Sequence, residues 1–203
     1  MNKKIPYYDK YETGDIILFS SHTRIPLLIQ SLTNSIYDHI GIILKNPYGN
    51  DPNGVYILEA INSRHGIQIR KLDEIYPIYR AELYWRKLNI KRDKKFYRKM
   101  HRVYKTIKKA SFMLSIRNFV EYLINFRLNN SNPPSTSKFF CASLIAYIYN
   151  ELGLLSHETQ WILIRPKDYG TEDPSDCRFK LNNKKCSLDK EIIIKKYGND
   201  DRS

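Results

Sequence analysis

The sequence predicts an α+β protein, because strand-like and helix-like segments occupy different parts of the chain. In the first eighty or so residues, short apolar segments alternate with turn-forming residues, as in strands. In the middle, apolar residues recur every three or four positions, as on one face of a helix. With 203 residues, 42% of them hydrophobic, the chain is long enough to bury one core. We therefore expect a single domain, 1–203.

The predicted strands share a short apolar run bounded by turn residues. They are 15–20, 39–44, 55–60, 66–70 and 79–85, with a last strand at 191–195. The second and third are joined by the turn-rich NPYGNDPNG and could form a hairpin. Between the first and second, residues 25–32 are predicted to form a short helix with Pro26 in its first turn.

The middle of the chain carries most of the positive charge. The net charge is +13, and residues 86–109 hold twelve Lys or Arg and one Asp, a local charge of +11. An apolar stripe runs opposite this basic face, and residues 119–124 extend it after a break; the stripe is Phe96, Met100, Val103, Ile107, Ala110 and Leu114. A basic helix attracts an anionic membrane surface or nucleic acid, or is simply solvated, and no nucleic-acid motif accompanies this one.

A further helix is predicted to begin at a cysteine in the sequence SKFFCASLIAYIY, 137–149. Thr136 or Ser137 is the expected N-cap and Gly153 the C-cap, so Cys141 lies in the first turn. There the partial positive charge of the helix N-terminus favours a thiolate. The alternative is an inert core cysteine.

A thiolate nucleophile is usually activated by an imidazole. Among five histidines, His39 is the strongest candidate because it begins an apolar strand, in YDHIGIIL. Glu59, on the next strand, could accept the imidazole N–H across the hairpin. His65, which also precedes a strand, is the competing base. Asp38 is ranked below Glu59 because it points away from His39 along the strand.

Cysteine spacing and the chain start bear on cofactors and compartment. Cys141, Cys177 and Cys186 are odd in number and lack metal-ligand spacing, so neither a disulfide framework nor a metal site is predicted. The start, MNKKIPYYDKYETGD, lacks the apolar core of a signal peptide, and no run approaches 18 apolar residues. We expect a soluble protein in the cytoplasm or another intracellular compartment.

Five motifs in order, TGDIILF, YDHIGIIL, VYILEA, FFCASLIAYIY and RPKDYG, resemble the circularly permuted NlpC/P60 papain-like superfamily. The resemblance is to the branch of the bacterial YiiX-like proteins and their poxvirus relatives, in which the histidine strand precedes the cysteine helix. It spans about 13–169, with a basic helical insertion at about 86–135. It implies an antiparallel sheet or partly closed barrel, with the cysteine helix packed against it.

By this resemblance Cys141 is the nucleophile, His39 the base and Glu59 the polar third residue. Asp15 matches a recurring Gly-Asp at a turn, and Asp168 matches a Pro-x-Asp-like element of unassigned role. The expected activity is that of a cysteine hydrolase or acyltransferase, which needs no cofactor and cleaves an amide, ester or thioester bond of a lipid or acyl-amide substrate. Two alternatives stay open: a non-catalytic lipid- or peptide-binding module, and a basic nucleic-acid-associated protein.

Overall fold

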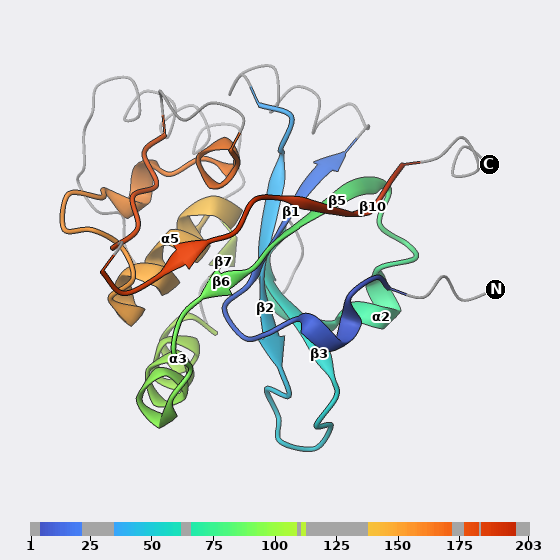
Figure 1. Ribbon diagram of the computed structural model, residues 1–203, viewed down its shortest axis with the longest axis horizontal. Helices are drawn as coiled ribbons and strands as arrows, with labels where there is room; N and C mark the ends of the chain where they lie inside the picture. Colours follow the sequence, from blue (N-terminus) through green and yellow to red (C-terminus); the bar gives the residue numbers. More distant parts are fainter. Residues whose placement is uncertain are drawn as a thin grey trace.

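The computed structural model describes residues 5–21, 35–61, 66–108, 111–112, 138–171, 177–182 and 184–197. Its centre is a six-stranded antiparallel sheet in the order β10-β5-β1-β2-β3-β4 (Figure 1). The strands are β1 (Ile16–Ser21), β2 (His39–Lys45), β3 (Val55–Ala60), β4 (Ile67–Lys71), β5 (Ala81–Arg86) and β10 (Ile192–Lys195). The predicted antiparallel sheet is confirmed. The described strands form an open sheet, with β10 and β4 at its edges, and not a barrel.

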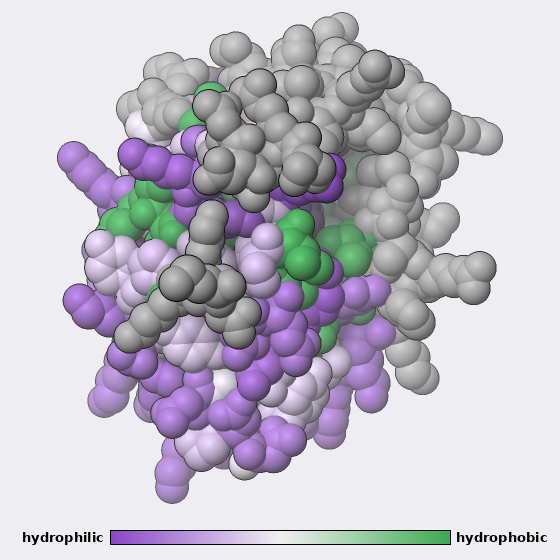
Figure 2. All heavy atoms as spheres, turned by 90° about the vertical axis from the view of Figure 1, so that its right-hand side faces the viewer, coloured by the Kyte–Doolittle hydropathy of each residue, from purple (hydrophilic) through white to green (hydrophobic). Residues whose placement is uncertain are grey.

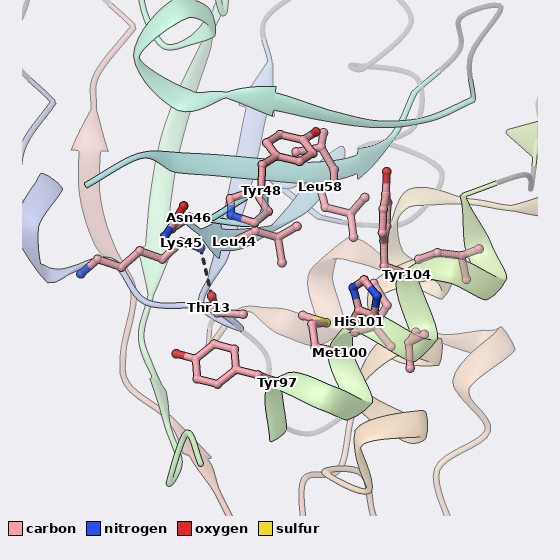
Figure 3. A pocket seen from close by; sticks show the side chains of 15 residues that line it. Thr13, Leu44, Lys45, Asn46, Tyr48, Leu58, Tyr97, Met100, His101 and Tyr104 are labelled. Atoms are coloured by element: carbon pink, nitrogen blue, oxygen red, sulfur yellow. Dashed lines mark hydrogen bonds between the residues drawn. The ribbon is translucent and has the colours of Figure 1, made fainter. Parts of the chain in front are cut away.

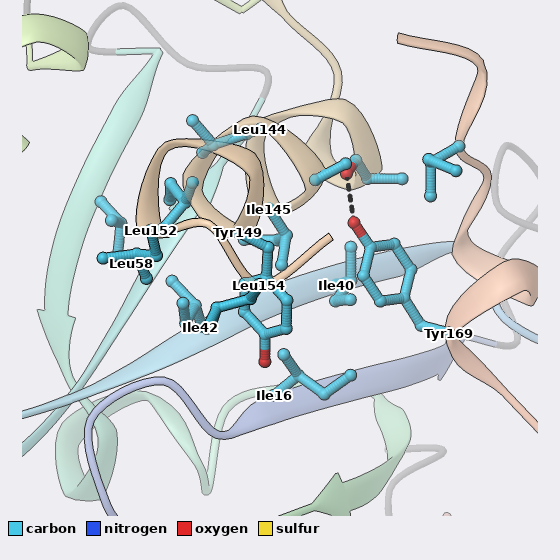
Figure 4. Packing of buried hydrophobic residues seen from close by; sticks show 14 of the residues in the cluster. Ile16, Ile40, Ile42, Leu58, Leu144, Ile145, Tyr149, Leu152, Leu154 and Tyr169 are labelled. Carbon is cyan, nitrogen blue, oxygen red and sulfur yellow. Dashed lines mark hydrogen bonds between the residues drawn. The ribbon is translucent and has the colours of Figure 1, made fainter. Parts of the chain in front are cut away.

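The helix that carries the cysteine, α5 (Cys141–Leu152), lies across one face of this sheet. Its apolar side chains pack on alternate residues of the central strands, among them Ile40 and Ile42 of β2 and Leu58 of β3 (Figure 4). The helix begins later than predicted. Phe140, in an extended conformation, is the N-cap residue, so the expectation of Thr136 or Ser137 as N-cap is wrong.

The end of α5 follows the prediction. Gly153 is the C-cap residue and has a φ of 74°, a conformation that glycine adopts without the steric penalty of a Cβ atom. At the other end, the Ser143 hydroxyl accepts a hydrogen bond from the Phe140 N–H at 3.0 Å, which fixes how the chain enters the helix.

The basic segment forms α3 (Lys94–Ile107), which packs against α5. Asp93 is the N-cap, accepting from the Phe96 N–H at 2.9 Å. The predicted apolar stripe is buried as far as Ile107, where the helix ends. The expectation that the helical stripe runs on to Leu114 is wrong in part, because residues 111–112 pair as a parallel strand with residues 138–139.

Tertiary pairing therefore overrides helical periodicity after Ile107. This pairing joins β7 (Ser111–Phe112) to β8 (Lys138–Phe139), just before Cys141. Ala110, Leu114, and the predicted segments 25–32 and 119–124 lie outside the described residues.

A third layer covers the other face of the sheet. It contains η1 (Tyr8–Lys10) and α2 (Leu72–Ile75), and its buried residues Tyr11, Leu72 and Ile75 pack with Ile17 and Ile57 of the sheet. Seen from the side of α2 and β10, the coloured part of the surface is mostly hydrophilic, with separate small hydrophobic patches (Figure 2). Helices of the described residues are all too short or too polar to cross a membrane.

The remaining short elements tie the C-terminal part of the chain to this frame. They are β6 (Leu88–Asn89), which pairs with β9 (Ser187–Leu188), and the 3-10 helices η2 (Trp161–Leu163) and η3 (Pro166–Tyr169). Of these, η3 lies against the start of the cysteine helix, because the Tyr169 hydroxyl donates to the Ala142 carbonyl at 2.8 Å (Figure 4).

Candidate active site

Cys141 is the first residue of α5, at the positive end of the helix dipole. No N-cap side chain takes up the N–H groups of this first turn, because Phe140 offers no acceptor. The cysteine keeps 9% of its surface exposed, so it is largely enclosed but not sealed. The N–H groups beside it could bind an oxyanion.

His39 begins β2, and its imidazole lies between two candidate partners. Its Nε2 is 2.7 Å from Oε2 of Glu59. Burial alone would lower the pKa of His39, but hydrogen bonds to Cys141 and Glu59 more than offset it and raise the pKa to about 10. Because Nε2 faces Glu59, Nδ1 is the nitrogen left for the sulfur. The structure thus brings together the three residues that the sequence singles out.

The sheet register explains how His39 and Glu59 meet. Ile42 pairs with Leu58 and Ile43 with Ile57, so alternation places Gly41 opposite Glu59, on the same face as His39. Only glycine fits at position 41 without a steric clash, because a Cβ atom there would lie 2.4 Å from Cδ1 of Ile57. The Phe19 ring, directly across from His39 in the pairing with β1, lies 4.9 Å from the imidazole, centroid to centroid.

Glu59 is held by two residues that sequence reasoning missed. Its Oε1 accepts from Nε and Nη2 of Arg70 at 3.0 and 2.5 Å. The Tyr79 hydroxyl lies 2.7 and 2.8 Å from the two carboxylate oxygens. Burial of Glu59, with 0% of its side chain exposed, would raise its pKa, but His39, Arg70 and Tyr79 together lower it. Glu59 is therefore a carboxylate.

The sequence held only part of the signal for Arg70 and Tyr79. Both fall in segments predicted to be strands, and an arginine or a tyrosine in a strand is typical of a position that faces solvent. Arg70 pairs with Ile57, diagonally next to Glu59, so only the register reveals the contact. Tyr79 precedes β5, and the predicted strand 79–85 began two residues too early.

The three aspartates considered from sequence lie outside this group and bind structural partners. Asp38 accepts from the Ser21 N–H and hydroxyl at 2.6 and 2.9 Å. Asp15 accepts from the indole of Trp85 and the Leu88 N–H, both at 3.0 Å, which joins β1 to the end of β5 as expected of a turn residue. 

Asp168 gains a role that the sequence left unassigned. It is buried and pairs with Arg165, whose Nη2 lies 2.7 Å from Oδ1. This pair fixes the short helix η3, and the next residue, Tyr169, bonds to the first turn of α5. Asp168 therefore supports the start of the cysteine helix through Tyr169.

Of the other histidines, the structure describes only His101 and His157, so the competing base His65 stays an untested alternative. His65 and His22 lie outside the described residues. His101 lies on α3 and lines a separate pocket, and His157 lines a hollow near Cys177. Among the described histidines, His39 therefore stands apart by its bond to a carboxylate and its electrostatic interaction with Cys141.

Comparison with known proteins supports the fold. No protein-family model matches the chain, and no curated protein matches it. Among solved structures, the chain is similar to the metalloprotein YiiX from Escherichia coli O157:H7, DUF1105, with a TM-score of 0.53 and 17% identity. The match covers 90% of this chain and 98% of that one. At this identity the likeness is one of fold, and the NlpC/P60 assignment stays a prediction.

The description of YiiX as a metalloprotein raises the question of a metal centre in this chain. Within the described ranges, no group of three or more His, Cys, Asp or Glu side chains could hold a metal ion. Both oxygens of Glu59 are also already bound, by His39, Arg70 and Tyr79. The described residues therefore do not fit a metal centre at Glu59.

Proposed function

We propose that this protein is a cysteine hydrolase or acyltransferase that uses Cys141, His39 and Glu59. The observation that carries the proposal is the imidazole of His39, which is hydrogen-bonded to Glu59 and interacts electrostatically with Cys141, the first residue of a helix. This is the arrangement of an activated thiol: a nucleophile, a base within reach, and a third group that orients the base.

In the proposed reaction, the Cys141 thiolate attacks the carbonyl carbon of an amide, ester or thioester. The backbone N–H of Cys141 donates to the oxyanion, and one such donor commonly lowers the barrier by about 3 kcal/mol. The tetrahedral intermediate then collapses: the bond from the acyl carbon to the leaving group breaks, the His39 imidazolium gives its proton to that leaving group, and the acyl group stays on the Cys141 sulfur. His39 then takes a proton from water, or from an acceptor in acyl transfer, as that molecule attacks the acyl carbon; the carbon–sulfur bond breaks and the Cys141 thiolate is restored beside the His39 imidazolium.

We further propose that the chain belongs to the permuted NlpC/P60 papain-like branch. The order of His39, Glu59 and Cys141 along the chain supports this, as does the fold similarity to YiiX. The three cysteines are free thiols, which fits the reducing intracellular compartment that the sequence predicts.

The substrate we propose is a lipid or acyl-amide presented at an anionic membrane surface. The exposed face of α3 supports this, because residues 94–107 contain six Lys or Arg and no Asp or Glu. Cations near lipid head groups contribute about 1 kcal/mol each. Binding to vesicles that contain phosphatidylserine, and its loss in high salt, would test the surface separately from the chemistry.

Alkylation with iodoacetamide, followed residue by residue with mass spectrometry, tests the nucleophile. Cys141 should react well before Cys177 and Cys186 near neutral pH, because burial raises the pKa of both other thiols. His39→Ala should slow the reaction at Cys141 by about a hundredfold and leave the other two rates unchanged. Equal rates at all three cysteines would overturn the proposal.

A second measurement follows the acyl group itself. Mixing the protein with a p-nitrophenyl acyl ester should add the acyl mass to Cys141, and Cys141→Ala should abolish both the adduct and turnover. An ester hydrolysis rate that survives Cys141→Ala would show that the activity lies elsewhere.

A further inference from the structure

A separate pocket lies between α3 and the sheet, away from the proposed active site. Its volume is about 320 Å³, and Figure 3 shows Leu44 and Leu58 of the strands on one side and Met100 and Tyr104 of α3 on the other. Cys141, His39 and Glu59 are not among its lining residues. Leu44 is five residues along β2 from His39, which separates the two places by roughly 17 Å.

The interior of this pocket is apolar and requires no polar ligand. Leu58, Met100, Val103 and Ile148 form part of its wall, and each is buried. Every buried side-chain nitrogen and oxygen in the described part of the chain already has a hydrogen-bond partner. A polar group placed inside would lose its water without gaining a bond, so the buried part of any ligand must be apolar. The volume is at the small end for ligand pockets and suits one narrow chain.

The rim is aromatic and carries a histidine. Tyr97, His101 and Tyr104 lie at i, i+4 and i+7 on α3, along one stripe of the helix that borders the pocket. Tyr48 lies on the opposite side, after β2. Tyr97 is 44% exposed and Tyr48 57% exposed, although both are large aromatic residues beside an apolar pocket. Exposed rings of this kind would cover the outer part of a bound chain.

Cations lie at and near the rim. Lys45 lines the pocket, where it also pairs with Glu12 at 3.2 Å, and two further cations on α3 flank His101 without lining the pocket. Arg98 and Lys105 are the i−3 and i+4 neighbours of His101, so they lie beside it on the helix surface. Neither aspartate nor glutamate is among the residues that line the pocket. A ligand whose apolar part enters the pocket would therefore place its outer end among cations, which favours an anionic head group.

We propose that this pocket binds one alkyl chain of a soluble anionic amphiphile such as a fatty acid. The chain lies against Leu44, Leu58 and Val103, and the head group lies at the rim beside His101, Arg98 and Lys105. This site is independent of Cys141, so its test does not depend on catalysis.

Titration calorimetry with sodium dodecanoate, below its micelle concentration, tests the proposal on the full chain and on Cys141→Ala. We expect saturable binding of one molecule to each protein, with the same affinity for both. Shortening the chain should weaken binding about fourfold for each methylene, which corresponds to about 0.8 kcal/mol, and lengthening should stop helping once the pocket is full. If the affinity keeps rising as the alkyl chain is lengthened, or if several molecules bind to each protein, the pocket is not the binding site.

Paired charge reversals test where the head group lies. Arg98→Glu with Lys105→Glu should weaken dodecanoate binding about tenfold. Lys95→Glu with Arg102→Glu changes the net charge equally, but neither residue faces His101, so this control should bind almost as well as the wild type. Equal losses in both double variants would mean that general charge, as on a membrane surface, governs binding. Equal affinity for dodecyltrimethylammonium would also contradict the proposal.

A filled pocket provides the last control. Val103→Phe should remove dodecanoate binding if the protein still unfolds cooperatively on heating, and unchanged binding would place the chain elsewhere. If this variant does not fold, the chain-length series on the wild type still decides the question. An alkyl chain could come from a free amphiphile or from a membrane lipid, and vesicles of phosphatidylcholine with phosphatidylserine separate these two sources. A protein that binds the vesicles but does not bind free dodecanoate would contradict the proposal of a soluble ligand.

Discussion

Among single residues, Glu59 shows most clearly how burial and chemistry are linked. A carboxylate with no exposed side-chain surface would be costly if it stood alone, by several kcal/mol. Arg70, Tyr79 and His39 repay this cost with hydrogen bonds to both oxygens. The sequence could nominate Cys141, His39 and Glu59, because each stands out within an apolar pattern. It could not nominate Arg70 and Tyr79, whose roles depend on strand register and on the turn after α2.

Tyr79→Phe tests this support at the residue scale. It removes one hydrogen bond from a buried charge and should cost about 1–3 kcal/mol of unfolding free energy. Because Glu59 then holds the imidazole less firmly, alkylation of Cys141 should also slow, by roughly tenfold. The measurements are urea unfolding and the iodoacetamide rate at Cys141.

A matched control for that variant is Tyr76→Phe. The Tyr76 hydroxyl is also buried and donates to the Ile194 carbonyl at 2.6 Å, but it does not bind Glu59. It should lower stability without slowing alkylation. If both variants slow alkylation equally, Tyr79 acts only through general stability.

At the scale of elements, the strands were predictable and the helix boundaries less so. Apolar runs bounded by turns located the six strands of the sheet to within two residues. The signal is most continuous in β1, β2 and β3, which are buried on both faces. The start of α5 was misplaced, because serine and threonine are common N-caps but Phe140 takes that position here. The end of α3 was misplaced, because residues 111–112 pair with a segment that is distant in sequence.

Two tyrosines anchor α5 in a similar way and allow a paired test of its position. The Tyr169 hydroxyl donates to the Ala142 carbonyl beside Cys141, and the Tyr149 hydroxyl donates to the Gly14 carbonyl at 2.6 Å. Replacing either with Phe should lower the unfolding free energy by about 1–2 kcal/mol. Only Tyr169→Phe should change the alkylation rate of Cys141, since only it touches the first turn. Equal effects of both variants on that rate would contradict a local role for Tyr169.

In the molecule as a whole, the sheet connects the proposed site to overall stability. His39 and Glu59 lie on β2 and β3, two neighbouring inner strands of the sheet, and their pKa values shift in opposite directions on folding. The sequence could predict that these residues meet. It could not predict how strongly folding shifts their pKa values, and so couples stability to pH, because this depends on burial and on Arg70 and Tyr79.

This coupling predicts how stability should change with pH. The pKa of His39 rises on folding from its ordinary value of 6.5 to about 10, so its contribution is complete below pH 6.5 and is lost as the pH rises toward 10. The pKa of Glu59 falls below its ordinary 4.5, so its contribution is present above pH 4.5 and is lost as the pH falls through the lower, folded-state value. Both contributions are therefore complete between about pH 4.5 and 6.5.

Urea unfolding of the wild type and His39→Gln at a series of pH values measures the histidine part. Because the glutamine side chain does not titrate in this range, the wild type should exceed the variant in unfolding free energy by the largest margin near pH 6. That margin should shrink steadily as the pH rises from 6.5 toward 10, since the unfolded chain no longer binds the proton that folded His39 retains. A margin that stays constant over this range would mean that the imidazole is not held as a cation between Glu59 and Cys141. The hydrogen-bonded group proposed to activate the thiol would then not exist in solution.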